Sequence, residues 1–245
     1  VVEFVVDLTP FAVLSLIANA VSTYGAKELI PLLGVLVLAW VLCAIQMFLI
    51  DGALIRFVGG LSPIRFFRGF WPAQVVAFTS QSSVGTIPVS VKQLVSRLGV
   101  NEDIASFVAA LGANLGMPAC AGIWPTLLAV LAINIFDIPY SIGQYAFLIV
   151  LTLIVSIGTV GVPGTSTVTT TALFTAAGLP VEIIVLLVPI SSVVDMMRTA
   201  ANVTGAATAA VLVAKSEQLL DREVYDQKKS EDGLSGAAAV GESAR

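Results

Sequence analysis

The sequence predicts an all-α integral membrane protein, built from spanning helices plus two re-entrant helical hairpins in an inverted repeat. The 245 residues are 57% hydrophobic and only 11% charged, whereas a soluble domain is typically about 25% charged. Uncharged runs at residues 29–50 and 104–136 exceed the roughly 20 residues that a spanning helix needs. Two further apolar runs, 66–98 and 141–178, are each interrupted by small residues and proline.

Six apolar blocks follow one another along the chain. They cover residues 10–22, 29–50, 66–98, 104–136, 141–178 and 181–213. We expect blocks one, two, four and six to span the membrane. Blocks three and five break at residues 80–88 and 158–164, which leaves arms too short to cross a hydrocarbon core of ~30 Å. Broken backbone at that depth needs cover from protein or a water-filled cavity, so both blocks are predicted to re-enter.

The two breaks resemble each other in sequence. Residues 83–87 read SVGTI and residues 156–160 read SIGTV. Each break is followed by one long apolar block, which predicts two units of hairpin plus spanning helix. Two such units in opposite orientation form the inverted repeat that is typical of membrane carriers.

Basic residues predict the orientation. With blocks three and five re-entrant, Lys27 falls on one side, Arg198 lies within the membrane, and all other basic residues share the opposite side. Those residues are Arg56, Arg65, Arg68, Lys92, Arg97, Lys215, Arg222, Lys228, Lys229 and Arg245. Lys and Arg concentrate on the cytoplasmic side of membrane proteins, so the C-terminus is predicted to be cytoplasmic.

Several kinds of chemistry are excluded by composition. The chain has no histidine, which removes His-based metal sites, Ser–His hydrolysis and His proton relays. Cys43 and Cys120 lie in separate apolar blocks and are expected to be buried small hydrophobes. The net charge of −4 implies no nucleic-acid partner. No enzyme, cofactor or metal site is predicted. The chain begins at Val1, which predicts that it is the C-terminal part of a longer protein.

One polar stripe interrupts the last apolar block. Asp195, Arg198, Thr199 and Asn202 are spaced i, i+3, i+4 and i+7, which places them on one face of a helix. Ionisable groups in a membrane helix usually face a cavity or one another. One interpretation is a structural Asp–Arg pair, but the added threonine and asparagine favour a solute site. Asp195 would hold an ammonium group, Asn202 and Thr199 a carboxylate, and Arg198 a second carboxylate through two donors.

The tips of the two hairpins are predicted to close this site with hydroxyls and free backbone N–H groups. The candidate residues on the tips are Ser82, Ser83, Gly161, Val162, Pro163 and Gly164. A carrier of a small carboxylate-bearing solute, such as an amino acid or dicarboxylate, is therefore favoured. A channel would show a continuous polar pore stripe. An intramembrane protease would need a Ser–His dyad or paired membrane aspartates. A non-transporting scaffold or receptor stays open as an alternative.

At these residues the sequence resembles the dicarboxylate/amino acid:cation symporter family, the glutamate transporter superfamily. The likeness covers nearly all of residues 5–216. It rests on four motifs, which are SSVGTIP at 82–88, GTVGVPG at 158–164, DMMRT at 195–199 and NVTG at 202–205.

The resemblance implies a secondary active transporter, a symporter, that works by an elevator-type mechanism. Residues 1–65 would form two scaffold or linking transmembrane helices. Residues 66–215 would form the transport domain, with hairpin 1, helix 7, hairpin 2 and helix 8. Residues 216–245 would be a cytoplasmic tail, a short frayed helix followed by disorder. The implied partners are a small-molecule substrate, membrane lipid and a homotrimer assembled through a scaffold partly missing from this chain, in the cell membrane.

The sequence departs from the family where the family binds sodium. The family's Asn-Met-Asp-Gly-Thr is here GMPAC, residues 116–120, and its later aspartate is Ala206. Hard cations favour charged or carbonyl oxygens, so coupling to H+, or to a reduced Na+ set, replaces the usual expectation. Facilitated transport also stays open. The candidate cation ligands are Asn114, Ser156, Ile157, Thr159 and Asn202.

Residues 119–125, ACAGIWP, are also similar to the L-cystine permease branch, which departs from the signature in the same way. Cystine carries two carboxylates and two ammonium groups, so Arg198 would keep a partner. A cystine-type amino acid carrier and a degenerate non-transporting membrane protein are the alternative interpretations.

Overall fold

The computed structural model describes residues 29–115, 117–158, 161 and 164–226. These residues are almost entirely helical, and within the described ranges no strand forms beyond one isolated bridge between Val100 and Leu220. The all-α prediction is confirmed. The first expected block, residues 10–22, lies outside the described residues.

The helices follow one another with short connections, and three segments labelled η are π-helical. In chain order they are α2 (Leu29–Ala44), η1 (Ile45–Ile50), α3 (Asp51–Ala53), η2 (Leu54–Val58), α4 (Pro63–Ser80), α5 (Ser83–Leu98), α6 (Glu102–Gly112), η3 (Pro118–Ile123), α7 (Trp124–Ile135), α8 (Ile142–Ser156), α9 (Thr165–Ala177), α10 (Glu182–Ser216) and α11 (Arg222–Tyr225).

Two helical segments of the described chain are long and apolar enough to cross a membrane. Leu33–Val58 runs without interruption from α2 to η2, and Pro118–Ile135 joins η3 to α7. The first segment continues past Asp51 to Val58, whereas the second apolar block was expected to end at residue 50. Asp51 is buried; the Gln46 amide donates to its Oδ1 at 3.4 Å, and its Oδ2 finds no partner among the described residues.

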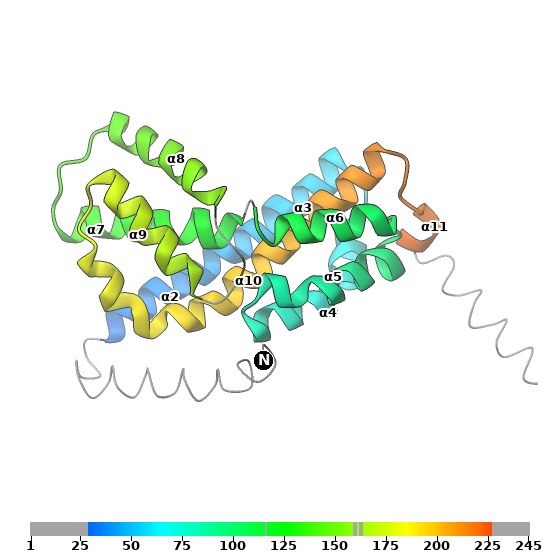
Figure 1. Cartoon of the computed structure of the whole chain (residues 1–245), viewed down its shortest axis with the longest axis horizontal. Coiled ribbons are helices and arrows are strands. Elements are labelled where there is room, and N and C mark those ends of the chain that lie inside the picture. Colours follow the sequence, from blue (N-terminus) through cyan, green and yellow to red (C-terminus); the bar gives the residue numbers. More distant parts are fainter. Residues whose placement is uncertain (1–28, 116, 159–160, 162–163, 227–245) are drawn as a thin grey trace, which may run out of the picture.

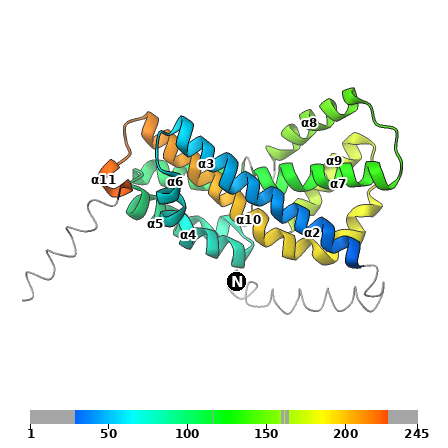
Figure 2. The same cartoon turned by 180° about the vertical axis from the view of Figure 1, so that it is seen from behind.

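Helix α10 passes through two separate hydrophobic cores. Its N-terminal half, Ile183 to Val194, packs with α7, α8 and α9. Its C-terminal half, Val203 to Ala214, packs with α4, α5 and α6. Figure 1 shows the two groups of helices as separate lobes, and Figure 2 shows the continuous run from α2 to η2 lying along α10 on the other side. Residues 195–202 of α10 therefore fall at the junction of the two cores.

The segments predicted as hairpins form two helix pairs. Helix α4 packs against α5, and α8 packs against α9. The first break is shorter than expected, because it contains only Gln81 and Ser82. Gln81 ends α4 in the left-handed conformation, with φ 54°, and the Ser82 hydroxyl accepts a hydrogen bond from the Gly85 N–H as the N-cap of α5. Pro88 consequently lies inside α5 instead of within the break.

The repeated pentapeptides do not occupy equivalent places. Residues 83–87 open the second arm of their pair, whereas Ser156 ends the first arm of its pair. The sequence match therefore does not by itself establish a structural repeat, and the inverted orientation stays a prediction.

The sequence predicted one helix for the fourth apolar block, but the structure divides this block into two parts. Helix α6 ends at Gly112 and the next helical segment starts at Pro118. Met117 is extended, with φ −84° and ψ 94°, because the ring of a following proline clashes with a helical preceding residue. Only the second half, Pro118–Ile135, has the length and composition of a span.

The first part of the expected tail is folded against the rest of the chain. Helix α11 packs on α5, and Tyr225 is buried with its hydroxyl donating to the Ser62 carbonyl at 2.9 Å. Arg65 forms an ion pair with Asp226. A short helix was expected at the start of the tail, and α11 lies there, held by contacts with other elements. Residues 227–245 lie outside the described residues.

We expect Tyr225→Phe to lower the free energy of unfolding by about 1 kcal/mol at pH 8, since it removes one buried hydrogen bond. Burial, and to a lesser extent the negative charge of Asp226, raises the pKa of the Tyr225 hydroxyl. The folded state thus holds this proton more tightly than the unfolded state. The advantage of tyrosine is present below about pH 10 and is lost as the pH rises further. Thermal unfolding of both proteins at pH 8 and 10.5 should show the gap closing; a constant gap would contradict this account.

Candidate functional site

The centre of the site is the Arg198 guanidinium, which lies in the middle of α10 with its side chain only 1% exposed. Its Nη2 donates to Asp195 Oδ1 at 2.9 Å and to the Ser191 carbonyl at 3.3 Å. Its Cζ lies 4.8 Å from the ring centroid of Trp124. Nε and Nη1 are buried and find no hydrogen-bond partner among the described residues. Because a guanidinium has five N–H donors, the one on Nε and the two on Nη1 are unsatisfied.

Unsatisfied donors at a buried charge are unusual. Each has left water without gaining a partner, at a cost of about 1–3 kcal/mol, and more at a charged group. Such atoms call for an explanation such as a ligand, an ion or a water molecule. Since Nη2 is already occupied, a carboxylate would first meet Nη1 or Nε of Arg198. The two-donor grip that the sequence suggested would need Nη2 to release Asp195 or Ser191.

Asp195 joins the site through one carboxylate oxygen. Its Oδ1 accepts from Arg198 and from the Cys120 thiol, whose sulfur lies 3.6 Å away. The intrahelical ion pair considered from the sequence is therefore formed, and it coexists with unsatisfied Arg198 donors. Oδ2 accepts no hydrogen bond from the described part of the chain.

The two polar atoms of the Asn202 side-chain amide differ in their hydrogen bonding. Its Oδ1 accepts from the backbone N–H groups of Ala119, at 2.9 Å, and Cys120, at 3.4 Å, and so anchors the start of η3. Its Nδ2 is buried and has no partner among the described residues. Thr199 is buried beside it on the same helix. All four residues of the predicted stripe are thus buried together between the two cores, and their binding roles stay predictions.

The tips of the two hairpins touch. The Val84 N–H donates to the Gly161 carbonyl at 3.2 Å, and the Gly161 N–H donates to the Ala113 carbonyl at 2.8 Å. A Cβ added at Gly161 would lie 2.5 Å from the Ala113 oxygen and 2.7 Å from the Ser83 Cβ. Only glycine permits so close an approach. Gly161 and Ser83 of the predicted site are therefore in contact.

The structure shows no hydrogen bond between the two tips at the other described residues of the predicted tip set. The Ser82 hydroxyl is used as an N-cap, and Gly164 is an exposed residue with φ 86° that precedes α9. Val162 and Pro163 lie outside the described residues.

Other polar residues near the site were missed by sequence reasoning. The Ser192 hydroxyl donates to Gln81 Oε1 at 3.2 Å and ties the first tip to α10, about one turn before Asp195. Ser166, on α9, has a buried hydroxyl without a partner in the described chain. Ser192, Gln81 and Ser166 do not stand out in the sequence, since serine and glutamine are common residues.

The candidate cation ligands are not brought together by any described contact. Asn114 is exposed and its Nδ2 donates to the Ala110 carbonyl of its own helix, while the Ser156 hydroxyl donates to the Leu153 carbonyl. Ile157 is exposed, Thr159 lies outside the described residues, and the Asn202 oxygen is already used.

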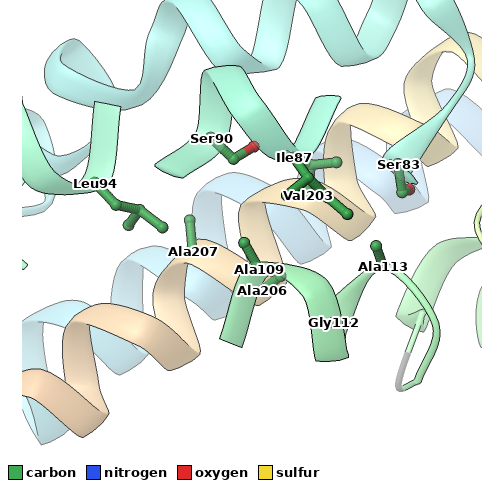
Figure 3. Close-up of a pocket in the computed structure, with 10 residues that line it drawn as sticks. All are labelled: Ser83, Ile87, Ser90, Leu94, Ala109, Gly112, Ala113, Val203, Ala206 and Ala207. Carbon is green, nitrogen blue, oxygen red and sulfur yellow. The ribbon is translucent and has the colours of Figure 1, made fainter. Parts of the chain in front are cut away.

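A small cavity lies between α5, α6 and α10, next to the first tip, with Ala206 and Gly112 on its wall (Figure 3). Among its lining residues only Ser83 and Ser90 have polar side chains. No group of three or more Cys, Asp or Glu side chains gathers elsewhere in the described ranges. The residues that the structure describes therefore offer no charged oxygen cage for a hard cation.

The Arg198 guanidinium is thus buried in the middle of α10, with donors that find no partner among the described residues, and the first tip is tied to the same helix through Gln81 and Ser192. The chain belongs to the sodium:dicarboxylate symporter family, whose profile matches residues 1–216. The resemblance seen in the sequence motifs is thereby confirmed.

Its relatives include the L-cystine uptake protein TcyP of Bacillus cereus, with 34% identity over 95% of this chain and 50% of that protein. The protein of the same name from Bacillus licheniformis is 34% identical over 93% of this chain and 49% of its own length. An uncharacterized symporter of Haemophilus influenzae is 35% identical over 90% of this chain and 49% of its own length. The chain thus spans about half the length of the curated relatives that it matches.

Proposed function

We propose that this chain is the solute-binding part of a secondary symporter for an amino acid or dicarboxylate. The observation that carries the proposal is the buried guanidinium of Arg198, on which three N–H donors find no partner in the part of the chain that the structure describes. A purely structural ion pair has no need for unpaired donors. A carboxylate of a bound solute would satisfy them with charge-assisted hydrogen bonds.

The substrate class favoured by the site is an amino acid with a second carboxylate, and the relatives named for L-cystine uptake support cystine within that class. The ammonium group would bind Asp195 Oδ2. The adjacent carboxylate would bind Asn202 Nδ2 and Thr199. The second carboxylate of the solute would bind Arg198 Nη1 or Nε, which the site leaves free.

The mechanism we propose is an elevator-type movement in which the two helix pairs, α7 and α10 travel as one body. The pairs α4–α5 and α8–α9 act as re-entrant hairpins from opposite sides of the membrane, and the C-terminus is cytoplasmic. The contact of the tips at Gly161 would close the solute in. The run from α2 to η2 packs along α10, and the Trp40 indole N–H donates to the Val193 carbonyl at 3.2 Å. We therefore propose that this helix moves with the transport domain, whereas the resemblance implied a scaffold or linking helix.

Coupling to protons, or to fewer sodium ions than in the rest of the family, fits the absence of carboxylates at Pro118 and Ala206. A homotrimer in the cell membrane, formed through a scaffold outside this chain, completes the proposal.

Uptake of a solute panel by the full-length protein in proteoliposomes tests the proposal. The panel contains L-cystine, aspartate, glutamate, succinate and neutral amino acids, with and without sodium and with and without a pH gradient. We expect saturable uptake with counterflow, strongest for amino acids with two carboxylates and driven by the proton gradient. Absence of saturable uptake under every condition would favour the degenerate, non-transporting alternative and would refute the proposal.

A further inference from the structure

We infer that Trp124 is a specificity-determining residue, which holds the Arg198 guanidinium in place while leaving its Nε and Nη1 donors free for a second solute carboxylate. This inference rests on the proposed function. Trp124 does not itself bind the carboxylate in this account; it acts through Arg198 and is a positioning residue.

Three contacts fix the Arg198 guanidinium, and they differ in what they consume. Asp195 and the Ser191 carbonyl each take a hydrogen bond from Nη2. The Trp124 ring, with the guanidinium Cζ 4.8 Å from its centroid, attracts the cation through its π face. This attraction acts on the charge of the guanidinium and does not use one of its N–H donors. The indole therefore restrains the cation and leaves the Nε and Nη1 donors unpaired.

A hydrogen-bonding residue at position 124 would have the opposite effect. The amide oxygen of glutamine, for example, would accept from Nη1 or Nε of Arg198 and compete with the solute. An aliphatic residue such as leucine would leave the donors free but would remove the attraction that holds the cation. Tryptophan has the strongest π face of the natural side chains, so it meets both requirements.

Trp124 is well placed to be rigid. It is 2% exposed and packs in the core that contains Leu128 and Val194. It opens α7 directly after η3, whose first N–H groups are anchored by Asn202 Oδ1. The ring and Arg198 are therefore held by the same junction of η3 with α10, so their relative position does not depend on a loop.

The test uses two competitors of labelled L-cystine uptake by the full-length protein. One is unlabelled L-cystine, and the other is the mixed disulfide of L-cysteine with cysteamine, which lacks one carboxylate. The inhibition constant of the mixed disulfide, divided by that of L-cystine, measures recognition of the second carboxylate. Should the uptake panel show aspartate as the solute, L-aspartate and L-asparagine form the equivalent pair.

We expect Trp124→Leu to reduce this ratio about fivefold to tenfold, and Trp124→Phe to reduce it less. Trp124→Gln should reduce it at least as much as Trp124→Leu, because its amide occupies a donor. Phe174→Leu is the matched packing control, because Phe174 is fully buried in the same core but its ring makes no cation–π contact with Arg198. This variant should leave the ratio unchanged.

Fluorinated tryptophans inserted at position 124 separate the π attraction from packing. Each added fluorine weakens the ring face with little change in shape, so the ratio should fall stepwise. This series also decides the matter if Trp124→Leu fails to fold. A ratio that stays constant across the series, in a protein that prefers L-cystine, would overturn the inference alone. A wild-type protein that takes up neither solute, or does not distinguish the two, would overturn the proposed function and the inference with it.

Discussion

Replacing Arg198 by alanine is expected to abolish measurable uptake of any solute with a second carboxylate. The change removes the three donors that would bind the second carboxylate of the solute, and truncating one partner of a buried charge pair across a binding interface costs about 2–5 kcal/mol. At 1.4 kcal/mol per tenfold, this corresponds to a loss of affinity of about thirtyfold to several thousandfold. Initial uptake rates and competition constants for L-cystine measure it.

The Arg198→Ala protein also leaves the Asp195 carboxylate buried and unpaired, which destabilises the fold by about 3–5 kcal/mol. A paired variant, Asp195→Asn with Arg198→Gln, removes both charges and serves as the stability control. Arg198→Lys keeps the charge but not the planar set of donors, so it should recover stability more than affinity. Unchanged uptake of dicarboxylate-bearing solutes by a folded Arg198→Ala protein would remove Arg198 from the site.

The second large effect is expected at Gly161, where the two tips meet. The methyl group of Gly161→Ala would lie 2.5 Å from the Ala113 carbonyl oxygen, a backbone atom that cannot move without disturbing its own helix end. The tips should separate, which loosens the hydrogen bond from the Val84 N–H to Gly161. We expect uptake to fall more than tenfold, with solute affinity falling as well, because an unclosed site stays open to water.

Gly158→Ala is the matched control for Gly161→Ala. It adds the same methyl group to the same connection between α8 and α9, but its Cβ would meet no described atom within 4 Å. Its uptake should stay within about twofold of the wild-type rate, as is usual for surface substitutions. Equal losses in both variants would mean that the connection tolerates no substitution, and the tip contact would lose its special role.

Much of the fold and of the site follows from short-range sequence patterns. The apolar runs predict membrane helices because lipid leaves a spanning chain few alternatives to helix. The spacing of Asp195, Arg198, Thr199 and Asn202 predicts one helix face, and the structure buries all four. Glycine and proline predicted the second tip correctly, since Gly164 has a positive φ, but at the first tip the left-handed residue is Gln81, which carries no such signal.

What the sequence could not predict depends on contacts between distant residues. The cation–π contact of Trp124 with Arg198 joins residues 74 positions apart, and no local pattern predicts it. The use of the Asn202 oxygen by Ala119 and Cys120 is of the same kind. The break before Pro118 was missed for a different reason, since uninterrupted apolar composition hid a proline that reshapes the residue before it.

The most direct test of the central claim is a structure of the full-length protein with L-cystine bound, determined by electron cryo-microscopy. The claim predicts a solute carboxylate oxygen about 2.7–2.9 Å from Nη1 or Nε of Arg198, with the guanidinium still over the Trp124 ring. A bound solute whose carboxylates lie elsewhere, with those Arg198 nitrogens still unpaired or filled by protein groups, would contradict it.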